Sequence, residues 1–243
     1  MGTSIIAGSN SRSSIILSLA LCVLTGVSAA QQADDAATIR AVDAAVMARF
    51  DAISSYTVTE HYAVFRNKDE IHPAAEMTVR TDYNKATGKT YTVLSRTGSD
   101  LLQKFVLDTI LENEKRINLP GNREKAWLTS ANYEMKLNAG EPQRFDGRDC
   151  LVLTIHPRSP APNLLDGTLW VDSKDGSIVQ IQGKASQSVS HFTGPTEMER
   201  QYANVDGFAM ATHAHATTSS FLFGPTIITI DYRDYQIQLN PAH

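Results

Sequence analysis

The sequence predicts a β-rich α+β fold, in which about nine or ten strands accompany about two main helices. The clearest observation is the segment 145–185, where the turn dipeptides Asp146-Gly147 and Asp175-Gly176 lie beside runs rich in β-branched, aromatic and alternating apolar residues. The second observation is a pair of stretches whose apolar residues recur every three or four positions, as they do in amphipathic helices. The elements therefore follow one another as helix, strands, helix, strands.

The start of the chain has the pattern of a secretory signal peptide. Arg12 is the only charged side chain before an apolar run from Ile15 to Leu24, and small residues follow up to Ala30. The run is shorter than the roughly 20 apolar residues that cross a bilayer, and the small residues fit the cleavage rule. We expect residues 1–30 to be removed, with cleavage after Ala29 as the alternative. The exported chain is then a single domain over 31–243.

Cysteine content and charge limit the classes of protein that fit. Cys22 lies in the apolar run of the leader, so the mature chain keeps only Cys150 and can form no internal disulfide. Burial alone must then stabilise the exported domain, and we expect Cys150 to be a buried thiol. The chain has 22 basic and 26 acidic residues, a net charge of −4, scattered without a basic block. This pattern argues against a nucleic-acid partner.

The first half of the mature chain predicts a helix followed by a strand meander. Asp34 and Asp35 can cap a helix that has one apolar face. From Tyr56 the apolar period changes to two, and it continues over 75–83 and 89–94 with a turn at 86–88, as expected for antiparallel strands. The apolar positions of the helix are Ile39, Val42, Val46, Phe50 and Ile53.

A second amphipathic helix is predicted to begin at Ser99-Asp100, which supplies an N-cap and an acidic residue in the first turn. It ends before Pro120-Gly121, and the weakly patterned segment 126–137 fits either a short helix or a strand. The apolar side of this helix comprises Leu101, Leu102, Phe105, Val106, Ile110 and Leu111.

The rest of the chain predicts two groups of strands. The 145–185 group is interrupted by an exposed loop at 157–163, where three prolines exclude regular structure. After a polar, irregular stretch, strands are expected over 198–204, 208–221 and 226–239. No linker rich in Pro, Ser or Gly divides the chain, which supports a single domain.

Several of these features together carry a family resemblance. The leader, the N-terminal helix, the meander, the mid-chain helix and the strand 167–172 (GTLWVD) with its Asp175-Gly176 turn resemble the LolA/LolB superfamily, which includes RseB-like proteins. The resemblance covers most of residues 34–239. It implies a strongly bent, unclosed antiparallel β-barrel, or half-barrel, with amphipathic helices covering its apolar concave face.

The resemblance also implies a function. Family members are periplasmic carriers in outer-membrane lipoprotein sorting and related sensors, so we expect lipid or lipoprotein acyl chains as the ligand. A membrane donor or acceptor protein is a further expected partner, and we expect a monomer with no cofactor. In LolA proteins an arginine near the first strands holds a lid helix closed, and here Arg66 and Arg80 are both available.

On this interpretation the mid-chain helix is a lid over an apolar groove. Each methylene that is buried contributes about 0.8 kcal/mol, so two or three lipid chains can replace the contacts of the lid. The same helix residues also fit an ordinary helix core, and Trp170 also fits a sheet core. The predicted residues of the groove and lid are Leu102, Phe105, Val106, Ile110 and Trp170.

Two other classes of function remain open from the sequence. The first is an RseB-like sensor or adaptor, in which the same groove regulates contact with a protein partner. The second is a metal-dependent enzyme that uses His213 and His215. They lie two apart on one strand face, a spacing that occurs in zinc and copper sites and that also fits an outward polar face of the strand. No third ligand stands at a suitable spacing, and the sequence has no GxSxG, HExxH or CxxC motif. We therefore expect a protein that is not an enzyme.

Overall fold

The structure is a computed structural model that describes residues 1, 17–67, 69–140, 142–161, 163–187, 194–220 and 223–241, with the side chains of 17–33 and 220 left out. The chain divides into two units, Met1–Ala37 and Thr38–His243, which are described separately. The first unit contains Met1 and the beginning of helix α1 (Leu17–Ala52). Most of the predicted signal peptide lies outside the described residues, so its cleavage stays a prediction. None of the described helices is long and apolar enough to span a membrane.

Helix α1 begins earlier than the sequence predicts. The two acidic residues Asp34 and Asp35 lie inside it, because the alanine- and leucine-rich residues before them also favour helix. In the second unit, residues 38–52 of α1 lead directly into the first strand, as expected from the change in apolar period at that point.

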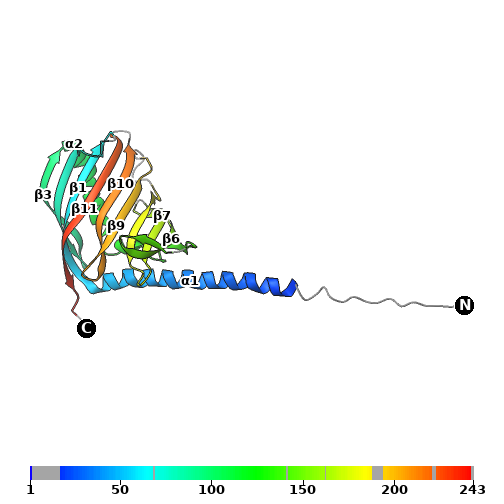
Figure 1. Cartoon of the computed structure of the whole chain (residues 1–243). Coiled ribbons are helices and arrows are strands. Elements are labelled where there is room, and N and C mark those ends of the chain that lie inside the picture. Colours follow the sequence, from blue (N-terminus) through cyan, green and yellow to red (C-terminus); the bar gives the residue numbers. More distant parts are fainter. Residues whose placement is uncertain are drawn as a thin grey trace. The chain divides into compact units, whose positions relative to one another are not determined.

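The second unit is built around one antiparallel sheet of eleven strands, counted over the described residues (Figure 1). The order is β3-β2-β1-β11-β10-β9-β8-β7-β6-β4, and β5 pairs with β6 alone. The end strands β3 and β4 are not paired with each other, so the sheet stays unclosed and the predicted fold class is confirmed. The strands are β1 (Ile53–Arg66), β2 (Ala75–Asn84), β3 (Gly88–Gly98), β4 (Tyr133–Leu137), β5 (Gln143–Phe145), β6 (Arg148–Pro157), β7 (Leu165–Asp172), β8 (Ile178–Ala185), β9 (Glu197–Val205), β10 (Phe208–Ser220) and β11 (Gly224–Leu239).

Of the two Asp-Gly turns predicted within 145–185, Asp146-Gly147 has two residues with positive φ, whereas at Asp175-Gly176 only Gly176 has a positive φ, of 72°; a further Asp-Gly turn is found at Asp206-Gly207. Asp146 and Gly147, between β5 and β6, have φ angles of 48° and 74°, and Asp206 and Gly207, between β9 and β10, have φ angles of 51° and 90°. Two successive residues with positive φ make the tight turn whose twist matches that of paired strands. These dipeptides therefore fix the hairpin register at both places.

The second predicted helix is present and contains a wider turn. It consists of α2 (Asp100–Leu102), a π-helical segment η1 (Gln103–Leu107) and α3 (Asp108–Ile117), and we call the whole of Asp100–Ile117 the inner helix. It starts just after β3 ends and runs back beside β3 to the other end of that strand, where the Asn118 backbone approaches Gly88. In Figure 1 this green segment lies behind the strands of the sheet.

One face of the sheet, which we call the inner face, can be followed across ten strands by register. The row of paired residues on this face starts at Leu137 on β4, ends at Arg96 on β3 and carries Arg200 near its middle. Its members are Leu137, Leu153, Leu169, Ile181, Arg200, Ala214, Ile230, Tyr62, Met77 and Arg96.

Two apolar clusters cover this face, one on each side of Arg200. In the first cluster, Val42 of α1 packs with Leu153, Leu169 and Ile181 of β6, β7 and β8. In the second cluster, leucines of the inner helix pack on β1 and β2. The two helices thus cover different halves of one face. Cys150 is buried, as predicted.

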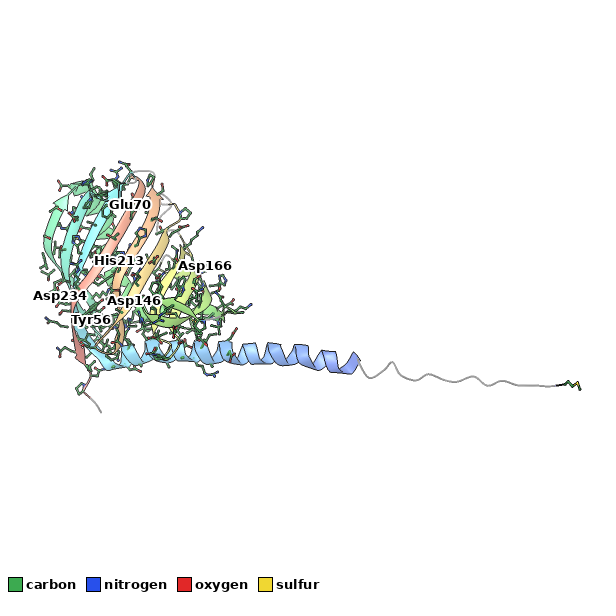
Figure 2. The ribbon with its side chains drawn as sticks, viewed as in Figure 1. Tyr56, Glu70, Asp146, Asp166, His213 and Asp234 are labelled. Atoms are coloured by element: carbon green, nitrogen blue, oxygen red, sulfur yellow. The ribbon has the colours of Figure 1, made fainter. Side chains whose placement is uncertain are left out.

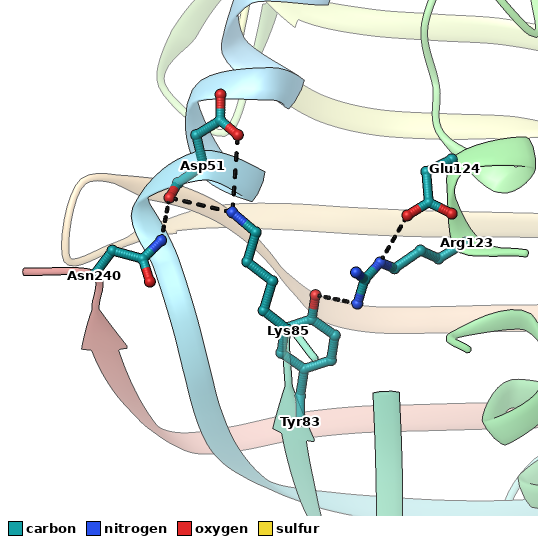
Figure 3. Close-up of polar contacts among 6 residues, drawn as sticks. All are labelled: Asp51, Tyr83, Lys85, Arg123, Glu124 and Asn240. Carbon is teal, nitrogen blue, oxygen red and sulfur yellow. Dashed lines mark hydrogen bonds and ion pairs between the residues drawn. The ribbon is translucent and has the colours of Figure 1, made fainter. Parts of the chain in front are cut away.

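Polar contacts join the end of α1 to residues at the ends of β2 and β11 (Figure 3). Arg123, in the short 3₁₀ helix η2 (Arg123–Ala126), donates to the Tyr83 hydroxyl at 3.2 Å and lies 4.9 Å from the Phe50 ring of α1. Lys85 Nζ lies 4.2 Å from the centroid of the same Phe50 ring, and it also pairs with Asp51. The ambiguous segment 126–137 thus begins at the end of a 3₁₀ helix and finishes as strand β4.

Candidate functional site

The apolar part of the candidate site is the interface between the inner helix and the sheet. Leu102, Leu107 and Leu111 are 1%, 0% and 7% exposed, and they belong to one cluster with Tyr62 and Met77. Val106 and Ile110 are partly buried against the same cluster. The side chains of the helix therefore cover this apolar surface in the structure, and a ligand reaches it only if the helix moves.

The π-helical segment changes which side chains face the sheet. Leu102 and Leu107 are five residues apart, a spacing that brings side chains to one face in a π-helix and not in an α-helix. Phe105, one of the predicted lid residues, is 55% exposed as a result. Leu107 is buried in its place; it lies three residues before Ile110 and four before Leu111, which are on the predicted apolar side.

Trp170 and the two histidines lie apart from the inner helix. Leu169 and Val171 are buried in the first apolar cluster, so Trp170 between them is on the outer face, where its indole donates to Gln143 at 3.2 Å. His213, labelled in Figure 2, comes from β10, and its Nδ1 lies 2.8 Å from Asp231 Oδ1. His215 follows on the same outer face, opposite Thr229. Over the described part of the chain, no three His, Cys, Asp or Glu residues gather as a metal site.

Polar contacts hold the first half of the inner helix at the edge of the sheet. The Gln103 side-chain amide is buried and donates to the backbone carbonyls of Glu76 and Thr97, both at 2.7 Å. Arg96 Nη2 donates to Asp108 Oδ1 at 2.6 Å. We call Arg96, Gln103 and Asp108 the rim latch. An open pocket of about 360 Å³ lies beside it, lined by these residues and by Lys104.

The two arginines considered from the sequence are engaged elsewhere. Arg66 donates through Nε and Nη2 to the Phe223 carbonyl, and Arg80 pairs with Asp82 on the same strand. Arg96 is the arginine that contacts the inner helix. No motif marks Arg96, and only the return of the helix along β3 brings the two together.

The second half of the inner helix is held by a charged contact inside the fold. Lys89 Nζ of β3 lies 3.1 Å from Glu114 Oε2 of α3, and the Lys89 side chain is 11% exposed. Burial alone would raise the pKa of the Glu114 carboxyl, but the positive charges of Lys89 and Arg200 outweigh that effect and lower it. Lys89 and Arg200 belong to strands five places apart in the sheet, so the inner face must curve around Glu114.

Further polar side chains surround this contact. The Glu60 side chain is 2% exposed, and the Tyr62 hydroxyl donates to its Oε2. Burial, followed by the charge of Glu60, raises the pKa of Tyr62, which keeps that hydroxyl protonated. We call Glu60, Lys89, Glu114 and Arg200, with the phenols of Tyr62, Tyr91 and Tyr232, the polar centre. The sequence did not reveal it, because its members are spread over 172 positions from Glu60 to Tyr232.

Comparison with known proteins finds likenesses of fold alone. No protein-family model and no curated protein sequence matches the chain. A LolA superfamily protein from Nitrosomonas europaea is 12% identical with a TM-score of 0.43, and covers 85% of this chain and 94% of its own. A DUF1329 family protein from Desulfovibrio piger is 13% identical with a TM-score of 0.42, over 84% and 94%. A domain described as lipoprotein-sorting, from Vibrio parahaemolyticus, is 14% identical with a TM-score of 0.43, over 81% and 91%.

Proposed function

We propose that this protein is exported to the periplasm and is a non-enzymatic carrier of lipid or lipoprotein acyl chains, which it binds between its curved sheet and its inner helix. The observation that supports the proposal is how the inner helix is attached. It covers an apolar surface with Leu102, Leu107 and Leu111, while polar contacts at the rim and at the polar centre fix its position. Such a helix can act as a lid.

The free energy lost when the inner helix leaves the sheet is similar to the free energy gained when acyl chains bind in its place. Uncovering three leucine side chains costs about 5–9 kcal/mol, at about 1.5–3 kcal/mol for each. At about 0.8 kcal/mol per methylene, roughly 6–11 methylenes of an acyl chain replace this amount when they bind to the same surface. Lipids with one or two long chains therefore suffice to hold the helix away from the sheet.

The π-helical segment supplies a place where the helix can bend. Sharp bends in helices occur at π turns, among other places, and such turns are frequent at functional sites. Here the π-helical segment begins at Gln103 and ends just before Asp108, the two inner-helix residues of the rim latch. We propose that the carrier works as a monomer that receives and delivers its cargo at membrane partners, in outer-membrane lipoprotein sorting.

Native mass spectrometry of the full chain, expressed with its leader and purified from a bacterial periplasm without detergent, tests the carrier function. We expect a bound lipid or lipopeptide, identified by organic extraction. Leu107→Glu places a charge on the covered surface and should abolish this mass. Leu101→Glu makes the same change at a position that is 62% exposed and should leave it unchanged.

A protein that carries no lipid and takes none up from phospholipid vesicles would contradict the carrier function. Because Leu107→Glu can also prevent folding, thermal unfolding of both variants must accompany the measurement. If only Leu107→Glu fails to fold, Leu107→Ala is used in its place, and a reduced but measurable lipid occupancy is expected.

A further inference from the structure

Three buried polar atoms of the polar centre lack a hydrogen-bond partner among the residues that the structure describes. They are Glu60 Oε1, Tyr91 Oη and Arg200 Nε. An unpaired polar atom away from water is costly, and folded proteins leave few of them. These atoms belong to β1, β3 and β9 and lie on the inner face. The other unpaired buried atoms among the described residues are Thr81 Oγ1, Glu124 Oε2 and Gln180 Oε1.

The polar centre lies between the two apolar clusters of the inner face. Arg200 stands in the inner-face row between Ile181 of the first cluster and Ala214, which precedes Ile230 of the second cluster. Glu60 lies next to Tyr62 of the second cluster on the same face of β1. The polar centre therefore borders the surface that the inner helix covers. A molecule whose chains lie on that surface can place its polar end at Arg200 and Lys89.

The inner helix and the sheet contribute different charged residues to the polar centre. Glu114 is the member of the polar centre that the inner helix supplies, whereas Lys89, Arg200 and Glu60 belong to the sheet. When the helix lifts, the sheet keeps two positive charges and one negative charge. Lys89 and Arg200 then lose the carboxylate that neutralised them. An anionic group that takes the place of this carboxylate is therefore favoured.

We propose that the site takes an amphiphile whose anionic group, a phosphate or a carboxylate, replaces the Glu114 carboxylate at Lys89 and Arg200 while its acyl chains replace Leu102, Leu107 and Leu111. This inference rests on the proposed carrier function and adds the chemical class of the ligand. The Arg200 guanidinium offers Nε as a donor, and an arginine fork suits a phosphate or a carboxylate. Glu60 Oε1 is an acceptor for a hydroxyl of the ligand.

A matched pair of ligands tests this class on the unmodified protein. 1-Oleoyl-glycerol 3-phosphate and 1-mono-oleoylglycerol share the chain and the glycerol and differ by the phosphate. Titration calorimetry below their micelle concentrations should show binding about tenfold or more tighter for the phosphate ester, the size of effect expected for charged hydrogen bonds. Equal affinities for the two would overturn the inference and leave the carrier function standing. Binding of neither would overturn the carrier function itself.

Free anion and lipid are distinguished by a third titration and by variants. Inorganic phosphate that binds as tightly as the phosphate ester would contradict an amphiphile site. Lys89→Met should remove most of the preference for the phosphate ester over mono-oleoylglycerol, and a preference that persists in this variant would contradict the role of Lys89. Lys115 is an exposed lysine of the inner helix, and the control variant Lys115→Met should keep the preference. Glu114→Gln should strengthen binding of the phosphate ester, because the internal competitor is gone; a weakening would count against the replacement.

Discussion

Arg96 of the edge strand β3 donates a 2.6 Å hydrogen bond to Asp108 of the inner helix, which joins two elements that follow each other directly in the chain. Gln103 lies between them and donates to two backbone carbonyls of β2 and β3. This latch is partly exposed, so it adds modestly to stability and can open without disturbing the core. The leucines beneath the helix supply the larger share of its attachment.

Arg96→Ala should loosen the inner helix without unfolding the sheet. The lost contact is worth about 1 kcal/mol or less at this exposure, which corresponds to roughly fivefold faster opening. Hydrogen exchange of the amides of α3 measures it. Arg80→Ala removes an arginine that pairs with Asp82 and should leave this exchange unchanged. Equal exchange in the two variants would show that the latch does not hold the helix.

Acid should weaken the attachment of the inner helix through Glu114. Because the folded pKa of Glu114 is lowered from its ordinary value of 4.5, its stabilising effect is fully present above that pH and is lost as the pH falls through the folded pKa. Urea unfolding of the natural chain and Glu114→Gln at several pH values measures this effect. At pH 7 we expect the variant to be less stable by about 1–3 kcal/mol. The difference should shrink as the pH is lowered below 4.5 and through the folded pKa, and a difference that is constant with pH would refute the assignment.

Gly88→Ala should destabilise the fold more than Gly121→Ala. Both glycines have a φ of about +84° to +90°, so both substitutions strain the backbone by about 1 kcal/mol. At Gly88 a Cβ would also lie 2.8 Å from the Asn118 carbonyl oxygen, whereas at Gly121 it would meet nothing within 4 Å. The extra loss, about 1–3 kcal/mol, reports the close approach of the end of the inner helix to β3. Denaturant unfolding of the two variants gives the comparison.

The leader should be removed on export. N-terminal analysis of the protein recovered from the periplasm should find Gln31 as the first residue, or Ala30 if cleavage follows Ala29. Replacing Ala30 and Ser28 by bulky residues should slow this removal, because both fit the small-residue rule. Recovery of Met1 in the periplasmic fraction would contradict a cleaved signal peptide.

The strands and the two helices could be predicted because their signals are local. Asp146-Gly147 and Asp206-Gly207 mark hairpins within a few residues, and the leucines of the inner helix show a helical period. The local signal fails at Phe105, where a π turn alters the spacing, so the predicted lid residue is exposed while Leu107 is buried. A regular period cannot anticipate an irregular turn.

The polar centre and the latch lay beyond sequence reasoning for a different reason. Lys89, Glu114 and Arg200 are ordinary charged residues in their local segments, and each fits a solvated surface. They become a group because the sheet curves and brings strands five places apart around one carboxylate. Register and curvature decide this, and neither follows from the spacing of single residues.

The pairing of β1 with β11 sets the order in which the domain can be completed. Ile53 pairs with Leu239, so a central seam of the sheet joins the first strand of the chain to its last. The hairpins of β6, β7 and β8 need only near neighbours and can form early, whereas this seam must close a loop of almost the whole domain. A chain without β11 would leave the facing edges of β1 and β10 unpaired, and such edges can pair with a strand of another chain and so promote aggregation.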